Sequence, residues 1–194
     1  MGTEARVPPR LRRRHRRRPP RFGPGMLVAT ILVAVASGCT TAAGGCAPLT
    51  LDDALSARLA RWQDELDFTP VVPCGSGSLH VARITLDRPA GQPRLTFVVA
   101  ADRSVFLMSQ SRAVRAFTQV PDGARRLEWS VEGTLVRGFE TVATAGPALL
   151  YLRWEVDRVT YEFQASLTRR YPSATLAAIA RDNVARTLGA AAAP

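Results

Sequence analysis

Apolar residues follow two periodicities along the chain, and each periodicity predicts a different kind of element. Between residues 79 and 165, short apolar-rich runs are separated by turns, as in a series of strands. In 126–131 and 159–165, apolar and polar residues alternate cleanly, which is typical of strands that bury one face. Turn-forming residues separate the runs, most clearly at 87–91. Residues 111–119 fit a strand and a short helix equally well. The segments that we assign to strands are 79–86, 94–101, 105–109, 126–131, 134–139, 149–154 and 159–165.

Two segments that flank the strands have helical spacing instead. The first covers about 51–67, and Pro70 and Pro73 follow its end; the second begins near Ser173. We expect Thr50 to cap the first helix and Ser173 the second, with Gly189 at the C-terminal cap of the second. The apolar positions that define the two helices are Leu51, Leu55, Leu59, Trp62 and Leu66, and then Leu176, Ile179, Ala180, Val184 and Leu188.

The order of these elements predicts an α+β domain. An antiparallel sheet of about six or seven strands would carry the N-terminal and the C-terminal helix packed on one face. A chain of 194 residues with 46% hydrophobic residues suits a single folded domain. We expect this domain to cover residues 50–189, with a frayed tail over 190–194.

The charge of the chain is concentrated at its N-terminus. The formal net charge is +10, and all 26 basic residues are arginines. Residues 1–25 hold nine of these arginines and a single acid, Glu4, so the remaining chain is close to neutral. The high pI therefore does not indicate a folded body that binds nucleic acid, and we expect no nucleic-acid partner.

An apolar segment follows the arginines and ends at a cysteine. Residues 26–37 are uncharged, and a helix of this length would span roughly 18 Å, short of the ~30 Å hydrocarbon core. A basic block, a short apolar segment and then small residues are typical of an export signal. The sequence Ala-Ser-Gly-Cys at 36–39 resembles the lipobox of bacterial lipoproteins, although Ala36 stands where that family prefers Leu or Val.

The lipobox resemblance implies that residues 1–38 are a signal peptide and that Cys39 carries the lipid, with palmitate among its acyl chains. Residues 39–49 would then be a flexible tether at the outer face of the cell membrane. Two alternatives stay open, an uncleaved membrane anchor and a cleaved soluble product. All three interpretations place the folded body outside the cytoplasm.

The other two cysteines, Cys46 and Cys74, flank the first predicted helix. That helix would be about 26 Å long, and the residues between its ends and the cysteines reach about 33 Å when extended. A disulfide between them is therefore feasible in an oxidising compartment. The sequence leaves open whether it forms.

Candidate catalytic and metal-binding residues are few. The exported body contains one histidine, His80, and no serine lies in a nucleophile-elbow motif. Asp52 and Asp53 sit where helix-terminal acids are common, so metal ligation by them is the less favoured interpretation. We expect no enzyme activity, no cofactor and no metal.

The last third of the chain carries a second resemblance. A strand that ends in Trp154, a tight turn, the strand of residues 158–165 and the helix of residues 174–180 follow one another. This order resembles the C-terminal end of a domain in bacterial, in particular actinobacterial, lipoproteins and in the outer regions of anti-sigma factors. It is also similar to periplasmic sigma-factor regulators, which bind an anti-sigma factor and sense lipidic signals. The turn of that family usually contains Asp-Gly, whereas this chain has Asp157-Arg158. The resemblance assigns no functional residue to this chain.

Two functions of different classes follow. The first is a non-catalytic exported lipoprotein that binds a protein partner or a regulatory ligand at the outer face of the cytoplasmic membrane. The second is a carrier of a lipid or another apolar ligand in a cavity between the sheet and a helix. The residues expected to line that cavity are Phe97, Val99, Phe106, Leu107 and Met108.

Overall fold

The structure is a computed structural model, and it describes residues 46–112, 119–142 and 147–193. These residues belong to one compact unit, Thr40–Pro194. The predicted cleavage region and Cys39 lie outside the described residues, as does most of the ambiguous segment 111–119. In the described part of the chain, no helix combines the length and the apolar character needed to span a membrane.

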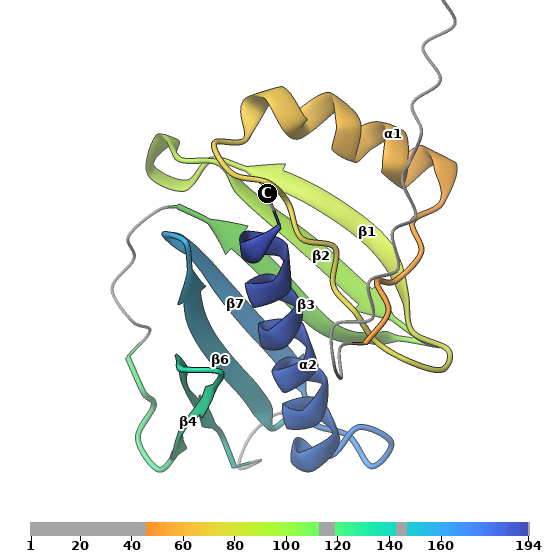
Figure 1. Ribbon diagram of the computed structural model, residues 1–194. Coiled ribbons are helices and arrows are strands. Elements are labelled where there is room, and N and C mark those ends of the chain that lie inside the picture. The colour runs from red at the N-terminus through yellow and green to blue at the C-terminus, as the bar shows by residue number, and fades with distance from the viewer. Residues whose placement is uncertain (1–45, 113–118, 143–146, 194) are drawn as a thin grey trace, which may run out of the picture. The chain divides into compact units, whose positions relative to one another are not determined.

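A seven-stranded antiparallel sheet forms the centre of the domain (Figure 1). Its strands lie in the order β1-β2-β3-β7-β6-β5-β4. The predicted α+β class and the antiparallel sheet are thereby confirmed. The strands are β1 (His80–Asp87), β2 (Arg94–Ala100), β3 (Ser104–Ser111), β4 (Arg125–Val131), β5 (Thr134–Glu140), β6 (Leu149–Val156) and β7 (Val159–Ser166).

Helix α1 (Asp53–Trp62) is shorter than predicted, and the 3₁₀ turn η1 (Gln63–Glu65) continues it. Its N-cap is Asp52 and not Thr50, so that expectation was wrong. The Asp52 Oδ1 atom accepts a hydrogen bond of 2.7 Å from the backbone N–H of Leu55. A carboxylate at this position also interacts favourably with the positive end of the helix dipole.

Helix α2 (Ser173–Ala192) crosses the apolar face of the sheet, as Figure 1 shows. Trp154 on β6 donates its indole N–H to the hydroxyl of Thr187 on this helix at 3.1 Å. Contacts of this kind place α2 on the apolar face. Helix α1 lies beside the edge strand β1, and its Leu55 side chain joins the same core cluster. That α1 packs on the same face as α2 stays a prediction.

Both expected caps of α2 were wrong. Pro172 is the N-cap, and the Ser173 hydroxyl donates instead to Glu140 Oε2 at 2.7 Å. At the other end, the helix continues through Gly189 to Ala192, so most of the predicted tail is helical. An exposed glycine inside a helix weakens it without ending it.

One face of the sheet, together with the helices, makes the hydrophobic core. The cross-strand register brings Ile84, Phe97, Met108, Phe163 and Leu152 into one row across five strands, and all five are fully buried. Aromatic rings pack within this layer, with the Phe106 and Phe163 centroids 4.6 Å apart and stacked. Burial in the same layer raises the pKa of Tyr161 to about 12.

The middle of the chain between η1 and β1, residues 71–74, is largely buried without forming a helix or a regular strand, and three side chains hold it. The Gln110 side chain accepts from the N–H of Val71 at 2.9 Å and donates to its carbonyl at 2.5 Å. The Asn183 side chain likewise accepts from the N–H of Cys74 at 2.9 Å and donates to its carbonyl at 3.1 Å. Arg186 donates to the Val72 carbonyl at 2.8 Å, and burial lowers the pKa of its guanidinium.

The N-terminal residues of the described chain are attached to this buried segment. Cys46 and Cys74 form a disulfide with Cα atoms 5.6 Å apart. Pro48 forms a β-bridge with Cys74, and the N–H of Leu49 donates to the Pro73 carbonyl at 2.9 Å. The folded domain therefore begins inside the segment that we expected to be tether, and Leu49 is already buried.

We predict that Asn183→Leu lowers the free energy of unfolding by about 3 kcal/mol, because it leaves the buried N–H and C=O of Cys74 without partners. Urea denaturation of the two proteins measures the change. Thr175→Leu, on an exposed position of the same helix, is the matched control and should change it by less than about 0.5 kcal/mol. Equal effects of the two variants would contradict the assigned role of Asn183.

We also predict that Arg158→Gly stabilises the domain by roughly 0.5–1 kcal/mol. Arg158 has φ +62° in the turn between β6 and β7. This backbone conformation is unfavourable for a residue that has a Cβ atom and nearly free of cost for glycine. The denaturation midpoint should therefore rise. Gly133→Ala, at φ +83° in the β4–β5 turn, is the converse control and should lower it. A lower midpoint for Arg158→Gly would contradict the strain argument.

Candidate functional site

The second face of the sheet has a polar central row beside a row that includes the buried side chains of Val98, Phe139 and Tyr151, and we call it the polar face. Its central row is fixed by the strand register and runs across all seven strands. The row consists of three hydroxyl residues on β1–β3 followed by four charged residues on β7, β6, β5 and β4, which is unusual for a surface meant to be covered by apolar packing. Its members, in order from β1 to β4, are Thr85, Thr96, Ser109, Glu162, Arg153, Arg137 and Glu128.

Hydrogen bonds between neighbouring strands order the central part of this row. The hydroxyls of Thr96 and Ser109 lie 2.9 Å apart. The Tyr151 hydroxyl, from the adjacent row, donates to Glu162 Oε1 at 2.7 Å. Nearer the β4 edge, Arg137 Nε donates to Glu128 Oε2 at 3.1 Å. These contacts fix the side chains without covering them.

A hollow of about 220 Å³ lies at the centre of the polar face. Arg94 stands at one end of it and donates to Asp87 Oδ1 at 2.9 Å. This bond and the charges of Asp87 and Glu162 raise the pKa of the Arg94 guanidinium. The hollow thus combines a fixed cation, a carboxylate and neutral hydroxyl and amide groups; its lining is Arg94, Thr96, Leu107, Ser109, Tyr151, Glu162 and Gln164.

A second hollow, of about 530 Å³, lies against β4 and β5. It is lined by Gln119, Val120, Arg126, Leu127, Glu128, Arg137 and Gly138. Gly138 is required where it stands, because a Cβ atom there would meet the backbone of β6 at Leu152 Cα, 2.9 Å away. The close approach of β5 to β6 is therefore built into the sequence.

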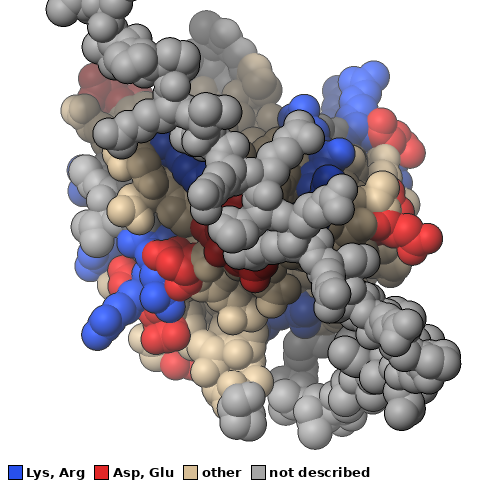
Figure 2. All heavy atoms as spheres, turned by 90° about the horizontal axis from the view of Figure 1, so that it is seen from above, with Lys and Arg blue, Asp and Glu red and all other residues tan. Residues whose placement is uncertain are grey.

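Charge on the described surface is mixed. Figure 2 shows basic and acidic side chains next to one another and not in separate patches. The ion pairs that join different elements include Arg88 with Glu65 and Arg125 with Glu140. The Arg125 and Ser173 hydrogen bonds lower the pKa of Glu140. A mixed surface of this kind suits a protein partner better than a polyanion.

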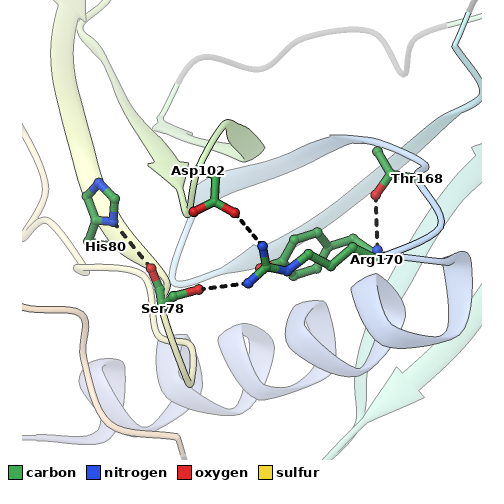
Figure 3. Close-up of polar contacts among 6 residues, drawn as sticks. Ser78, His80, Asp102, Thr168 and Arg170 are labelled. Atoms are coloured by element: carbon green, nitrogen blue, oxygen red, sulfur yellow. Dashed lines mark hydrogen bonds and ion pairs between the residues drawn. The ribbon is translucent and has the colours of Figure 1, made fainter.

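His80 does not meet the requirements of a Ser–His–Asp triad. Its Nδ1 atom lies 3.3 Å from the backbone carbonyl of Ser78, not from a hydroxyl (Figure 3). Arg170 pairs with Asp102 and donates to the Ser78 hydroxyl at 3.4 Å. The cluster therefore neutralises Asp102 and leaves no contact from a carboxylate to the imidazole among these residues.

The side chains predicted to line an apolar cavity take other roles. Phe97, Val99, Phe106 and Met108 are fully buried members of the core cluster. Leu107 points to the opposite face, where it borders the central hollow. These four side chains are therefore part of the packed core and do not line the cavity that a carrier of an apolar ligand would need.

Asp52 is a helix cap, and Asp53 lies in the first turn of α1. In the described part of the chain, no three His, Cys, Asp or Glu side chains come together in a way that would hold a metal ion. Cys39 lies outside the described residues.

Sequence reasoning did not single out the central hollow. The alternation in 126–131 and 159–165 already assigned Glu128, Glu162 and Gln164 to the polar side of their strands. Their neighbours across the sheet depend on the order of the strands, which alternation does not reveal. No signal within a single strand connects Arg94 with Glu162.

No protein-family model matches the chain, and neither a curated protein nor a solved structure shows significant similarity to it. The resemblance to lipoproteins and to the outer regions of anti-sigma factors thus stays a prediction from the residues that carry it.

Proposed function

We propose that this chain is a non-catalytic lipoprotein, anchored by Cys39 at the outer face of the cytoplasmic membrane, that binds a protein partner on its polar face. The observation that carries the proposal is the unequal use of the two faces of the sheet. One face builds the core with α2, whereas the other holds ordered polar side chains around a central hollow.

Two further observations support this location and this kind of ligand. A disulfide between Cys46 and Cys74 is typical of an oxidising compartment outside the cytoplasm. The polar face carries fixed charges of both signs, and such surfaces select partners by complementary charge. The central hollow is small, so it suits a side chain of a partner or a small regulatory ligand better than an acyl chain.

The anchoring is tested by Cys39→Ser. We expect the variant to lose metabolic labelling with a palmitate analogue and to move from the membrane fraction to the soluble fraction. The double variant Cys46→Ser/Cys74→Ser is the control, and it should keep the label because neither residue is the proposed lipid site. Unchanged labelling and membrane retention of Cys39→Ser would contradict lipid anchoring.

The binding face is tested by Gln164→Arg. Gln164 is exposed and borders the central hollow, so a longer charged side chain there should obstruct it while leaving the core unchanged. We expect the variant to lose at least about 90% of the partner that cross-links to the wild-type chain in membranes, the equivalent of a tenfold weaker complex. Thr175→Arg places the same side chain on an exposed position of α2, away from the polar face, and should retain the partner. Loss of the partner with Thr175→Arg alone, or no loss with either variant, would contradict this surface.

A further inference from the structure

The two edges of the sheet differ in how well they are protected against pairing with another strand. On β1, the register shifts between Val81 and Arg83, and α1 lies beside the strand. Strand β4 pairs with β5 in unbroken register over all seven of its residues, from Arg125 to Val131. It contains no proline and no bulge, two of the devices by which natural proteins protect edge strands.

The turn that follows β4 determines which backbone groups point outward. Glu132 has φ +47° and Gly133 has φ +83°, as a type I′ turn requires. The residues that close such a two-residue hairpin, Val131 and Thr134, exchange both of their hydrogen bonds. Because hydrogen-bonded and open positions alternate, Leu127 and Trp129 also bond to β5.

The intervening residues Arg126, Glu128 and Ser130 therefore direct their N–H and C=O groups away from the sheet. In the described part of the chain, no backbone hydrogen bond from outside the sheet reaches these three residues. They form a row of donors and acceptors in the spacing of an antiparallel ladder, and an added strand would complete it.

The surroundings of this edge specify the charge of such a strand. The hollow of about 530 Å³ lies against β4 and contains the side chains of Arg126, Glu128 and Arg137. Arg137 pairs with Glu128, whereas Arg126 has no ion-pair partner in the ranges that the structure describes. The net charge is thus positive, and an Arg guanidinium binds carboxylates well.

We propose that the outer edge of β4 binds an extended, acidic peptide segment of a protein partner by strand addition. Gln119 and Val120 line the hollow together with β4. A hollow bordered in this way suits one extended chain better than the edge of a second folded sheet. The proposal uses residues outside the central hollow of the polar face, so it does not depend on the outcome of the Gln164→Arg test.

Hydrogen exchange of the full chain in detergent micelles, followed residue by residue by NMR, tests the proposal directly. The probe is a synthetic peptide of alternating Thr and Glu, and a peptide of alternating Thr and Lys is its control. We expect the amides of Arg126, Glu128 and Ser130 to exchange fast in the free protein and to slow when the acidic peptide is added. The amides of Leu127 and Trp129 should be slow in both states.

Two variants separate the backbone contribution from the charge. Ser130→Pro removes one outward N–H at an edge position that tolerates proline, and it should weaken the peptide complex. Arg126→Glu should weaken it about tenfold, while Arg83→Glu, the same change on the opposite edge strand, should leave it unchanged.

Protection away from β4, or equal binding of the lysine peptide, would overturn the proposal. It would also be overturned by slow exchange at these three amides without peptide in a chain that sediments as a dimer, because a second copy would then occupy the edge.

Discussion

The backbone from Val71 to Cys74 is buried but belongs to no helix or regular strand, so its polar groups must find partners inside the protein. Leaving such groups unpaired costs about 1–3 kcal/mol each. Gln110 and Asn183 meet this requirement, each bonding both to an N–H and to a carbonyl of the segment. These two amides connect the middle of the sheet and α2 to the chain that leads to the disulfide.

The arrangement of the two faces follows from this constraint. Because the buried segment and α2 occupy the side of the sheet that bears the aromatic core, the apolar residues of that side are used for folding. The opposite side carries hydroxyl, amide and charged groups held by cross-strand contacts such as that of Tyr151 with Glu162, and beside them the stacked rings of Phe139 and Tyr151. The same sheet therefore supplies a stable scaffold and an ordered polar surface.

The sequence predicted the elements that depend on local patterns. All seven strands were found because short apolar-rich runs between turns, with clean alternation in 126–131 and 159–165, are properties of each strand alone. The β6–β7 hairpin formed although Arg158 replaces the usual glycine. The predicted caps of the helices were wrong. Asp52 caps α1 in place of Thr50, and the Ser173 hydroxyl donates to Glu140 instead of capping α2. At the other end, α2 continues through Gly189.

The candidate sites were less predictable, because they join distant parts of the chain. The Asn183 side chain bonds to a residue 109 positions away, and the Gln110 side chain to one 39 positions away, so neither partner is visible in the sequence. The central row of the polar face likewise requires the order of the strands. The sequence predicted the polar side only for the two cleanly alternating strands, 126–131 and 159–165.

We propose that one face of the sheet serves folding and the other serves binding. Hydroxyl-radical footprinting of the chain in membranes, with and without its cross-linked partner, tests this claim most directly. We predict that the partner protects Arg94, Leu107 and the other exposed side chains around the central hollow and leaves the outer surface of α2 unchanged. Protection of α2 with an unchanged polar face would contradict it.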